Sequence, residues 1–387
     1  MKIVVAPDSF KESLTAMQVA GAIADGIRPA LPEAECDLRP VADGGEGTVD
    51  AIVSAVGGQI HHTTVMDPLG RTVPSFFALL PDNKTAIIEV AAASGLHFVR
   101  PEHRSPLNAT SYGSGQLVKA ALDAGARKLI IGLGGSATND AGAGLLEALG
   151  FRLLNKGGQP IGRGGAALAQ LERIDTLRLD PRLKQTELLV ACDVTNPLCG
   201  PEGASHVFGA QKGASQEDIL KLDKNLLHFA EIVSRDLQRD IAHVSGAGAA
   251  GGMGAALLGV LNAHMYAGFD IIAQITNLEE TISSADLVIT GEGRLDSQSI
   301  FGKTPVGVAR LAQKHGVPVI AIAGSIETDL QTLSPYGFSA LFSVNPRLCS
   351  LETALQNAED NIRACSRNIA SAYALGMKQL ASKECRF

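Results

Sequence analysis

The feature that most constrains this chain is a repeated order of strand, glycine-containing turn and helix. Short apolar runs, which are typical of buried strands, end at turns and are followed by segments with apolar residues at helical spacing. The first run covers residues 2–6, and segment 15–28 follows it with Val19, Ile23 and Ile27 on one helical face. Strands that alternate with helices predict an α/β protein with a mainly parallel sheet.

This order is clearest near the two ends of the chain. Further strands are predicted at 36–42, 86–91, 128–133, 187–191, 287–290, 317–323 and 340–344, and further helices at 49–56, 114–124, 144–149, 216–235 and 351–380. A chain of 387 residues exceeds the size at which one hydrophobic core stops growing. We therefore expect two α/β domains: a Rossmann-like domain of residues 1–60 and 281–387, and a second domain, 61–280, inserted within it.

Composition excludes several classes of function. The net charge is −7, aromatic residues make up 4% and there is no Trp. Without a run of Lys and Arg or a row of aromatic side chains, no nucleic-acid partner is expected. The longest uncharged stretch, 244–267, is interrupted by glycines, so we expect a loop and helix there and no membrane span. The six cysteines lack zinc-site spacing and the amino terminus lacks a long apolar core, which together favour a cytoplasmic protein.

Polar residues gather where the predicted strands end, which is where open α/β sheets bind ligands. The clusters are Asp8-Ser9-Phe10-Lys11, Asp43 with Glu46, Thr138-Asn139-Asp140, Asp193 with Thr195 and Asn196, and Glu292 with Arg294 and Asp296. A single Asp after a strand is also an ordinary turn former or helix cap. Together the clusters suit a magnesium–phosphate site, because Mg²⁺ binds one or two carboxylates and substrate phosphates.

Two glycine-rich segments add to this pattern. The first, 132–137, lies between a predicted strand and helix, so the backbone N–H groups of 134–137 are candidates for holding a triphosphate. The second, 246–251, has the pattern Gly-x-Gly-x-x-Gly after a short candidate strand at 241–244. Both are weak indications of a dinucleotide site, and close packing of small residues explains them equally well.

The triplet Gly302-Lys303-Thr304 resembles the end of a Walker phosphate-binding loop. That loop needs a glycine where this chain has Ser297, so a P-loop is rejected. Lys303 stays a candidate contact for a phosphate group because its ammonium is a compact positive charge.

Six longer segments resemble the bacterial glycerate kinase family, and within it the glycerate 2-kinases. They are residues 6–11, 41–48, 132–140, 191–198, 246–254 and 290–296, in the family's order along residues 1 to about 375. The resemblance implies a two-domain α/β enzyme that uses ATP and Mg²⁺ to phosphorylate D-glycerate to 2-phosphoglycerate. We expect D-glycerate and ATP as its small-molecule partners. The sequence leaves the oligomeric state open, with a homodimer as one candidate.

Roles for individual residues are inferred from phosphoryl-transfer chemistry, which needs positioning, charge neutralisation and a group that orients the attacking hydroxyl. Asp193 is the first candidate for the general base or a metal ligand, and Asp8 and Asp43 are the next candidates for the metal. Lys11 and Arg294 are expected to contact phosphates or the glycerate carboxylate. The binding candidates are Asp8, Ser9, Asp43, Glu46, Gly134, Gly135, Ser136, Thr138, Asn139, Glu292, Asp296 and Lys303.

Three alternatives remain open at this point. The first is a glycerate 3-kinase, which would transfer phosphate to the other hydroxyl. The second is a dinucleotide-dependent oxidoreductase, which only the glycine patterns support. The third is a sugar-acid-binding protein without turnover, which leaves the many carboxylates at strand ends unexplained.

Overall fold

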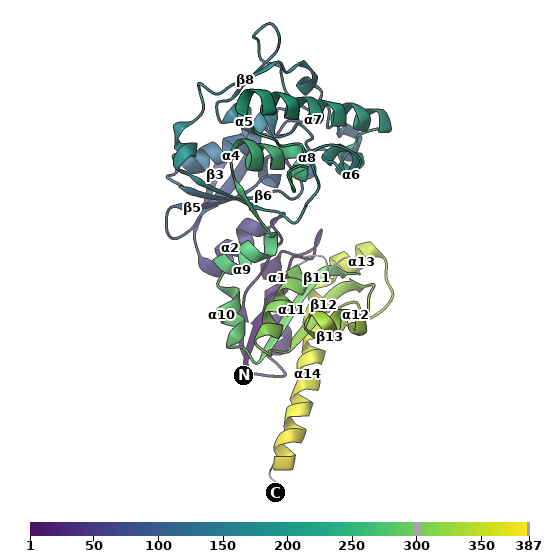
Figure 1. Cartoon of the computed structure of the whole chain (residues 1–387). Coiled ribbons are helices and arrows are strands. Elements are labelled where there is room, and N and C mark those ends of the chain that lie inside the picture. Colours follow the sequence, from purple (N-terminus) through teal and green to yellow (C-terminus); the bar gives the residue numbers. More distant parts are fainter. Residues whose placement is uncertain (297–303, 385–387) are drawn as a thin grey trace. The chain divides into compact units, whose positions relative to one another are not determined.

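The computed structural model describes residues 1–296 and 304–384, and it divides the chain into two compact units (Figure 1). Unit 1 consists of residues 1–43, 50–56 and 269–387, and unit 2 consists of residues 44–49 and 57–268. Unit 1 therefore takes both ends of the chain. The predicted domain limits at residues 60 and 281 stay a prediction.

Unit 1 is built on a five-stranded sheet with the order β13-β12-β11-β1-β2. All neighbouring strands are parallel. The strands are β1 (Lys2–Val5), β2 (Glu35–Leu38), β11 (Leu287–Leu295), β12 (Val319–Ile326) and β13 (Phe338–Ser343). The prediction of an α/β fold with a mainly parallel sheet is confirmed.

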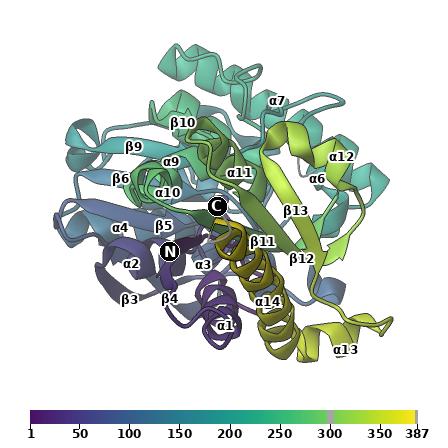
Figure 2. The ribbon, with the colours of Figure 1, turned by 90° about the horizontal axis from the view of Figure 1, so that it is seen from below.

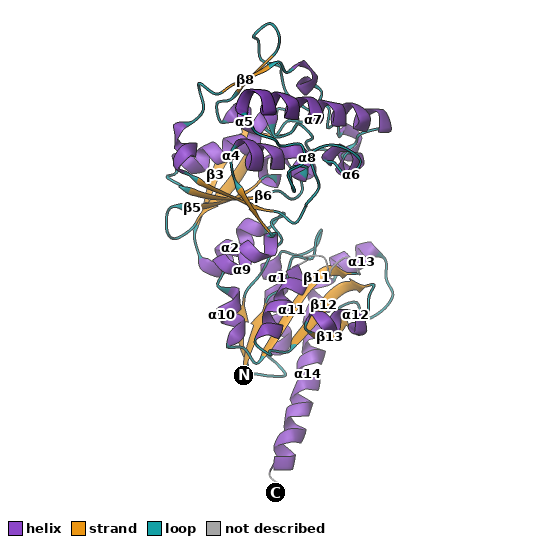
Figure 3. Ribbon diagram, in the orientation of Figure 1, coloured by secondary structure: helices purple, strands orange, loops and turns teal. Residues whose placement is uncertain are grey.

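Helices cover both faces of this sheet, which explains the uninterrupted apolar character of its strands. Ile3 and Val5 of β1 pack toward α1 (Ala16–Ile27) and α14 (Ala358–Glu384), whereas Val4 packs toward the opposite layer. That layer contains α9 (Gly268–Ile275), α10 (Leu278–Ser283), α11 (Thr304–Lys314) and α12 (Leu330–Leu333). Figure 2 shows α1 and α14 side by side, and Figure 3 shows the strands between the helices.

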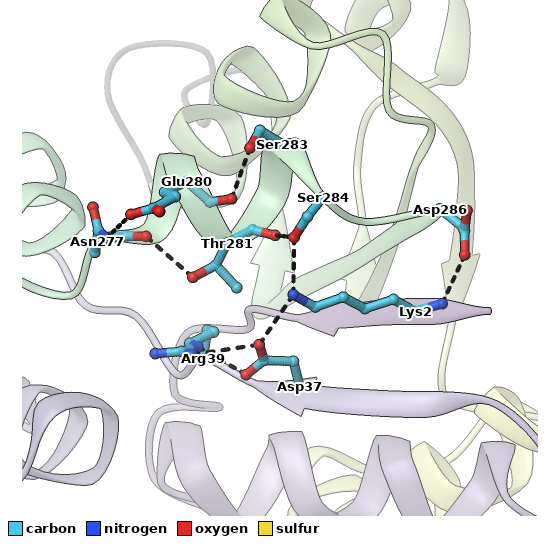
Figure 4. Close-up of polar contacts among 9 residues, drawn as sticks. All are labelled: Lys2, Asp37, Arg39, Asn277, Glu280, Thr281, Ser283, Ser284 and Asp286. Atoms are coloured by element: carbon cyan, nitrogen blue, oxygen red, sulfur yellow. Dashed lines mark hydrogen bonds and ion pairs between the residues drawn. The ribbon is translucent and has the colours of Figure 1, made fainter.

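The amino end of the sheet is joined by a polar network (Figure 4). The Lys2 Nζ donates to Ser284 Oγ at 2.9 Å and lies 3.6 Å from Asp37 Oδ2. Arg39 Nε donates to the same carboxylate, at Oδ1, over 2.8 Å, and the backbone N–H of Lys2 donates to Asp286 Oδ2 at 2.7 Å. These contacts link β1 with β2 and with the segment that precedes β11.

Unit 2 is built on a mixed six-stranded sheet with the order β10-β9-β6-β5-β4-β3. Strands β5 (Thr85–Glu89), β6 (Lys128–Gly132), β9 (Glu187–Ala191) and β10 (His264–Tyr266) are parallel, and the antiparallel strands β3 (Gln59–Met66) and β4 (Thr72–Leu79) extend one edge. A small antiparallel pair, β7 (Arg152–Leu154) and β8 (Arg173–Asp175), lies outside this sheet. The β3–β4 pair is absent from the sequence predictions because half of β3 is polar and partly exposed.

The helices of unit 2 pack around one large core. They are α3 (Ala91–Ser94), α4 (Tyr112–Asp123), α5 (Ala143–Ala148), α6 (Ala204–Phe208), α7 (Gln216–Leu237) and α8 (Ala249–Gly254), while α2 (Thr48–Val56) spans the boundary of the two units. Ser215 caps α7 through a reciprocal capping box with Asp218. No helix among the described residues has the length and apolar character of a membrane span.

Two local predictions are wrong. Strand β11 was expected to end at residue 290, but it continues to Leu295 because Arg294 and Leu295 still pair with Ser325 and Ile326 of β12. The expected strand at 241–244 is a loop, since the carbonyl of Ala242 accepts from Leu198 N in another loop.

Candidate functional site

A cavity of about 1020 Å³ opens in unit 1 where β1, β11, β12 and β13 end. Polar residues from these strand ends line it: Asp8, Ser9, Lys11, Asp43, Glu292, Arg294, Thr304, Ser325, Asn345 and Arg347. Parallel strands bring their carboxyl ends to one edge, which is why residues nearly 300 positions apart in sequence meet here. Six of the predicted site residues therefore line this one cavity of unit 1. They are Asp8, Ser9, Lys11, Asp43, Glu292 and Arg294.

Two carboxylates interact at the base of this cavity. The pKa of Asp8 is raised to about 6, chiefly because burial removes water from its carboxylate and then because Asp43 is negatively charged. Two hydrogen bonds to the Asp8 carboxylate, from the side chain of Thr304 and from the N–H of Ser9, lower its pKa. Carboxylates are ligands that Mg²⁺ uses in proteins, so Asp8 and Asp43 stay candidates for holding a metal.

The two predicted cations of this cavity differ in their surroundings. Lys11 Nζ lies 4.0 Å from Asp43 Oδ2 on a side chain that is 79% exposed. Arg294 Nη2 donates to Glu327 Oε2 at 2.6 Å, and its Nε lies 3.4 Å from Asp296 Oδ2. Carboxylates contact the Arg294 guanidinium closely, whereas Lys11 lies farther from its carboxylate partner and is more exposed, so Lys11 can reach a substrate anion more easily. Glu327 was not predicted from the sequence, and Lys303 lies outside the described residues.

A second polar cluster is buried in unit 2 around a residue that sequence reasoning missed. Lys212 is 2% exposed, and its Nζ donates to Ser136 Oγ at 2.9 Å and to the carbonyl of Thr138 at 2.7 Å. Burial lowers the pKa of Lys212 to about 7, although the nearby carboxylate of Asp140 favours the charged form. No sequence pattern distinguishes Lys212 from an ordinary surface lysine.

The neighbours of Lys212 are equally buried. The carboxylate of Asp140 accepts from the backbone N–H and hydroxyl of Ser111 and from the N–H groups of Gly142 and Gly144. Among the described residues, Thr138 Oγ1 and Asn139 Nδ2 have no hydrogen-bond partner. A buried polar atom left unpaired costs about 1–3 kcal/mol, so a bound water or ligand group would stabilise this cluster.

The glycines of segment 132–137 allow close packing of the backbone, and they do so whether or not a ligand binds there. A Cβ on Gly132 would lie 2.2 Å from the carbonyl oxygen of Gly44, and one on Gly134 would lie 2.6 Å from the Cα of Gly45. The N–H of Gly134 already donates to the carbonyl of Gly44, and the N–H of Ala137 donates to the carbonyl of Ser94. The N–H groups of residues 135 and 136 stay candidates for phosphate binding.

Segment 246–251 is also explained by packing. The N–H groups of Gly246 and Gly248 donate to the carbonyls of Thr195 and Asn196, at 3.1 and 2.9 Å. A Cβ on Gly251 would lie 1.9 Å from the carbonyl oxygen of Thr138. This geometry does not form the strand–turn–helix that a dinucleotide site requires.

Asp193 and Glu46 belong to unit 2 and are exposed. Asp193 follows the buried strand β9, as predicted, and its Oδ1 accepts from the N–H of Gly268, the first residue of α9, at 2.9 Å. The carboxylate therefore interacts with the beginning of a helix, where a negative charge is favourable. Whether it also takes part in chemistry stays a prediction.

A parallel sheet covered on both faces, with charged side chains around a large cavity at its carboxyl edge, is typical of enzymes that bind small phosphorylated molecules. The chain belongs to the glycerate kinase family, whose model matches residues 3–374. It is 52% identical over 378 residues to the glycerate 2-kinase of Escherichia coli K12, covering 98% of this chain and 99% of that protein. A glycerate kinase of Halalkalibacterium halodurans is 51% identical over 95% of this chain and 97% of its own.

Solved structures give the same result. A crystal structure from Salmonella typhimurium LT2, of a protein assigned as glycerate kinase 2, matches with a TM-score of 0.88 at 50% sequence identity. The match covers 98% of this chain and 99% of that one. Both the sequence and the fold therefore place the chain in this family along nearly its whole length.

Proposed function

We propose that this protein transfers the γ-phosphate of ATP to the 2-hydroxyl of D-glycerate and releases ADP and 2-phosphoglycerate. The observation that carries the proposal is the family match over residues 3–374. The 2-hydroxyl is chosen because the relative that is 52% identical is named a glycerate 2-kinase. The charged cavity of unit 1 supports this function because phosphoryl transfer relies on positioning and charge neutralisation.

Mg²⁺ is proposed as the metal, and the acidic pair at the cavity fits it. Among the described residues, no group of three or more His, Cys, Asp or Glu side chains is placed to hold a metal. Asp8 and Asp43 would supply one or two carboxylates, and phosphate oxygens would complete the shell, which is how Mg²⁺ is usually held. When bound, the ion would neutralise charge on the phosphates.

The remaining roles are assigned by the same chemistry. Lys11 is proposed to contact the phosphates as a mobile positive charge, and Arg294 to add positive charge from its carboxylate-held position. Asp193 is proposed as the general base or as a metal ligand. A homodimer, a cytoplasmic location and the lack of a nucleic-acid partner stay predictions.

The test is a coupled assay that reports the position of the new phosphate. Purified protein with MgATP and D-glycerate should form ADP, and the product should be converted to phosphoenolpyruvate by added enolase alone. A requirement for phosphoglycerate mutase before enolase would show that the product is 3-phosphoglycerate. Binding of glycerate without ADP formation would indicate a binding protein and contradict the kinase proposal.

A further inference from the structure

We propose that the cavity of unit 1 is the ATP site and that its apolar side receives the adenine ring. We call this side the apolar rim and define it as Pro346, Leu348, Leu351 and Leu355, which all line the cavity. The inference rests on the proposed kinase function, since it assigns one of that reaction's two substrates to a place in the fold.

The size of the cavity favours ATP over D-glycerate as its ligand. Its volume is about 1020 Å³. Pockets of about 300–1,000 Å³ normally enclose most of a drug-sized molecule. A three-carbon acid would occupy only a small part of this space, whereas a nucleoside triphosphate would occupy much more of it and still fit.

The distribution of polarity in the cavity also matches ATP. Asp8, Lys11 and Asp43 lie near one another in the lining and supply the charge that a triphosphate and its counter-ion need. On the rim, Leu348 is 103% exposed and Leu351 is 72% exposed. Exposed leucines that line a cavity are favourable surfaces for the flat, weakly polar face of a purine, because covering them removes apolar area from water.

Hydrogen bonds anchor the backbone at both ends of the rim and at the start of α13 (Leu351–Gln356). Before it, Asn345 Nδ2 donates to the carbonyl of Gly324 at 2.7 Å, and Asn361 Nδ2 donates to Asn345 Oδ1 at 3.1 Å. Within it, Ser350 caps α13 by accepting from Thr353 N. After it, Ser13 Oγ donates to the carbonyl of Leu355 at 2.9 Å. A wall fixed before binding loses little conformational freedom when the ligand arrives.

Binding measurements on leucine variants test the assignment. Leu348→Ser and Leu351→Ser, singly and together, would be titrated with MgATP and with magnesium tripolyphosphate, which lacks base and ribose. The matched control is Leu177→Ser, which removes a 92% exposed leucine of unit 2. We expect the double variant to lose about tenfold or more in ATP affinity, which is about 1.4 kcal/mol. Tripolyphosphate affinity and the KM for D-glycerate should stay at the wild-type values, and the control should match wild type throughout.

Photolabelling gives a second readout that does not depend on activity. Irradiation of wild-type protein with 2-azido-ATP should label the tryptic peptide 348–363, which carries Leu348, Leu351 and Leu355. Labelling confined to peptides of unit 2, or unchanged ATP affinity in the double variant, would overturn the assignment. Protein that binds ATP through the rim but does not phosphorylate glycerate would refute the proposed function and leave this site standing.

Discussion

Asp193 is the residue on which the proposed chemistry depends most. It follows a buried strand, it is exposed, and one of its oxygens accepts from the N–H of Gly268. The change Asp193→Asn keeps a carbonyl oxygen for that hydrogen bond but removes the charge and the basic oxygen. If Asp193 is the general base, kcat should fall by about 10²-fold or more, measured by ADP release at saturating substrates.

The same variant distinguishes two chemical roles and a structural one. A metal ligand would show a raised Mg²⁺ requirement that excess Mg²⁺ or Mn²⁺ partly relieves, whereas a general base would not be rescued. Circular dichroism should be unchanged in either case. A variant with near-normal kcat at saturating metal would remove Asp193 from the mechanism and leave only its contact with the beginning of α9.

Lys212 should make the stability of unit 2 depend on pH. Its folded pKa is about 7 because it is buried, while lysine in an unfolded chain titrates near 10.4. Between these values the unfolded state binds more protons, so the free energy of unfolding should rise with pH, by at most about 1.4 kcal/mol per pH unit. Below about pH 7 both states are protonated and the dependence should vanish.

Replacing Lys212 isolates its contribution to the pH dependence of the free energy of unfolding. In Lys212→Met, the rise between about pH 7 and pH 9 should be missing from urea unfolding curves. The control Lys221→Met changes an exposed lysine of α7 and should keep the wild-type slope. Equal slopes in wild type and Lys212→Met would show that Lys212 does not titrate in this range.

At the scale of elements, α7 offers a test of local sequence signals. Ser215 accepts from Asp218 N, and Asp218 accepts in return from Ser215 N. Because the substitution Ser215→Ala removes the side-chain acceptor of the Asp218 N–H, it should lower the free energy of unfolding by about 1 kcal/mol.

The control for this prediction lies in the same helix. Ser234 is exposed in the last turn of α7, away from the capping box, and Ala has a higher helix propensity than Ser. Ser234→Ala should therefore leave stability unchanged or slightly higher, as measured by the urea midpoint. A similar loss in both variants would show that the capping box is not the cause.

For the whole molecule, ligand-dependent stability separates a kinase from an oxidoreductase. A ligand at 100 times its Kd stabilises the folded state by about 2.7 kcal/mol. MgATP should therefore raise the Tm in a concentration-dependent manner, whereas NADH at the same concentration should not. A rise with NADH alone would favour the oxidoreductase and contradict the assignment of both glycine-rich segments to packing.

The sequence alone was sufficient to predict the features that depend on neighbouring residues. The buried strands, the capping residue Ser215 and the position of Asp8, Asp43 and Asp193 after apolar runs follow from neighbouring residues, and so does the α/β class. The Rossmann-like sheet from both chain ends also follows, because only the outer segments show regular alternation of strand and helix.

Other features depend on residues that are far apart in sequence, so only the tertiary structure decides them. Strand β11 continues to Leu295 because β12 pairs with it, and Arg294 is held by Glu327 across that pair. Lys212 is buried because Ser136 and Thr138 accept its hydrogen bonds from another segment. Local pattern determined which elements form and which polar residues end them, whereas long-range packing determined which of those residues meet, because the energy of a contact is gained only once both partners are in place.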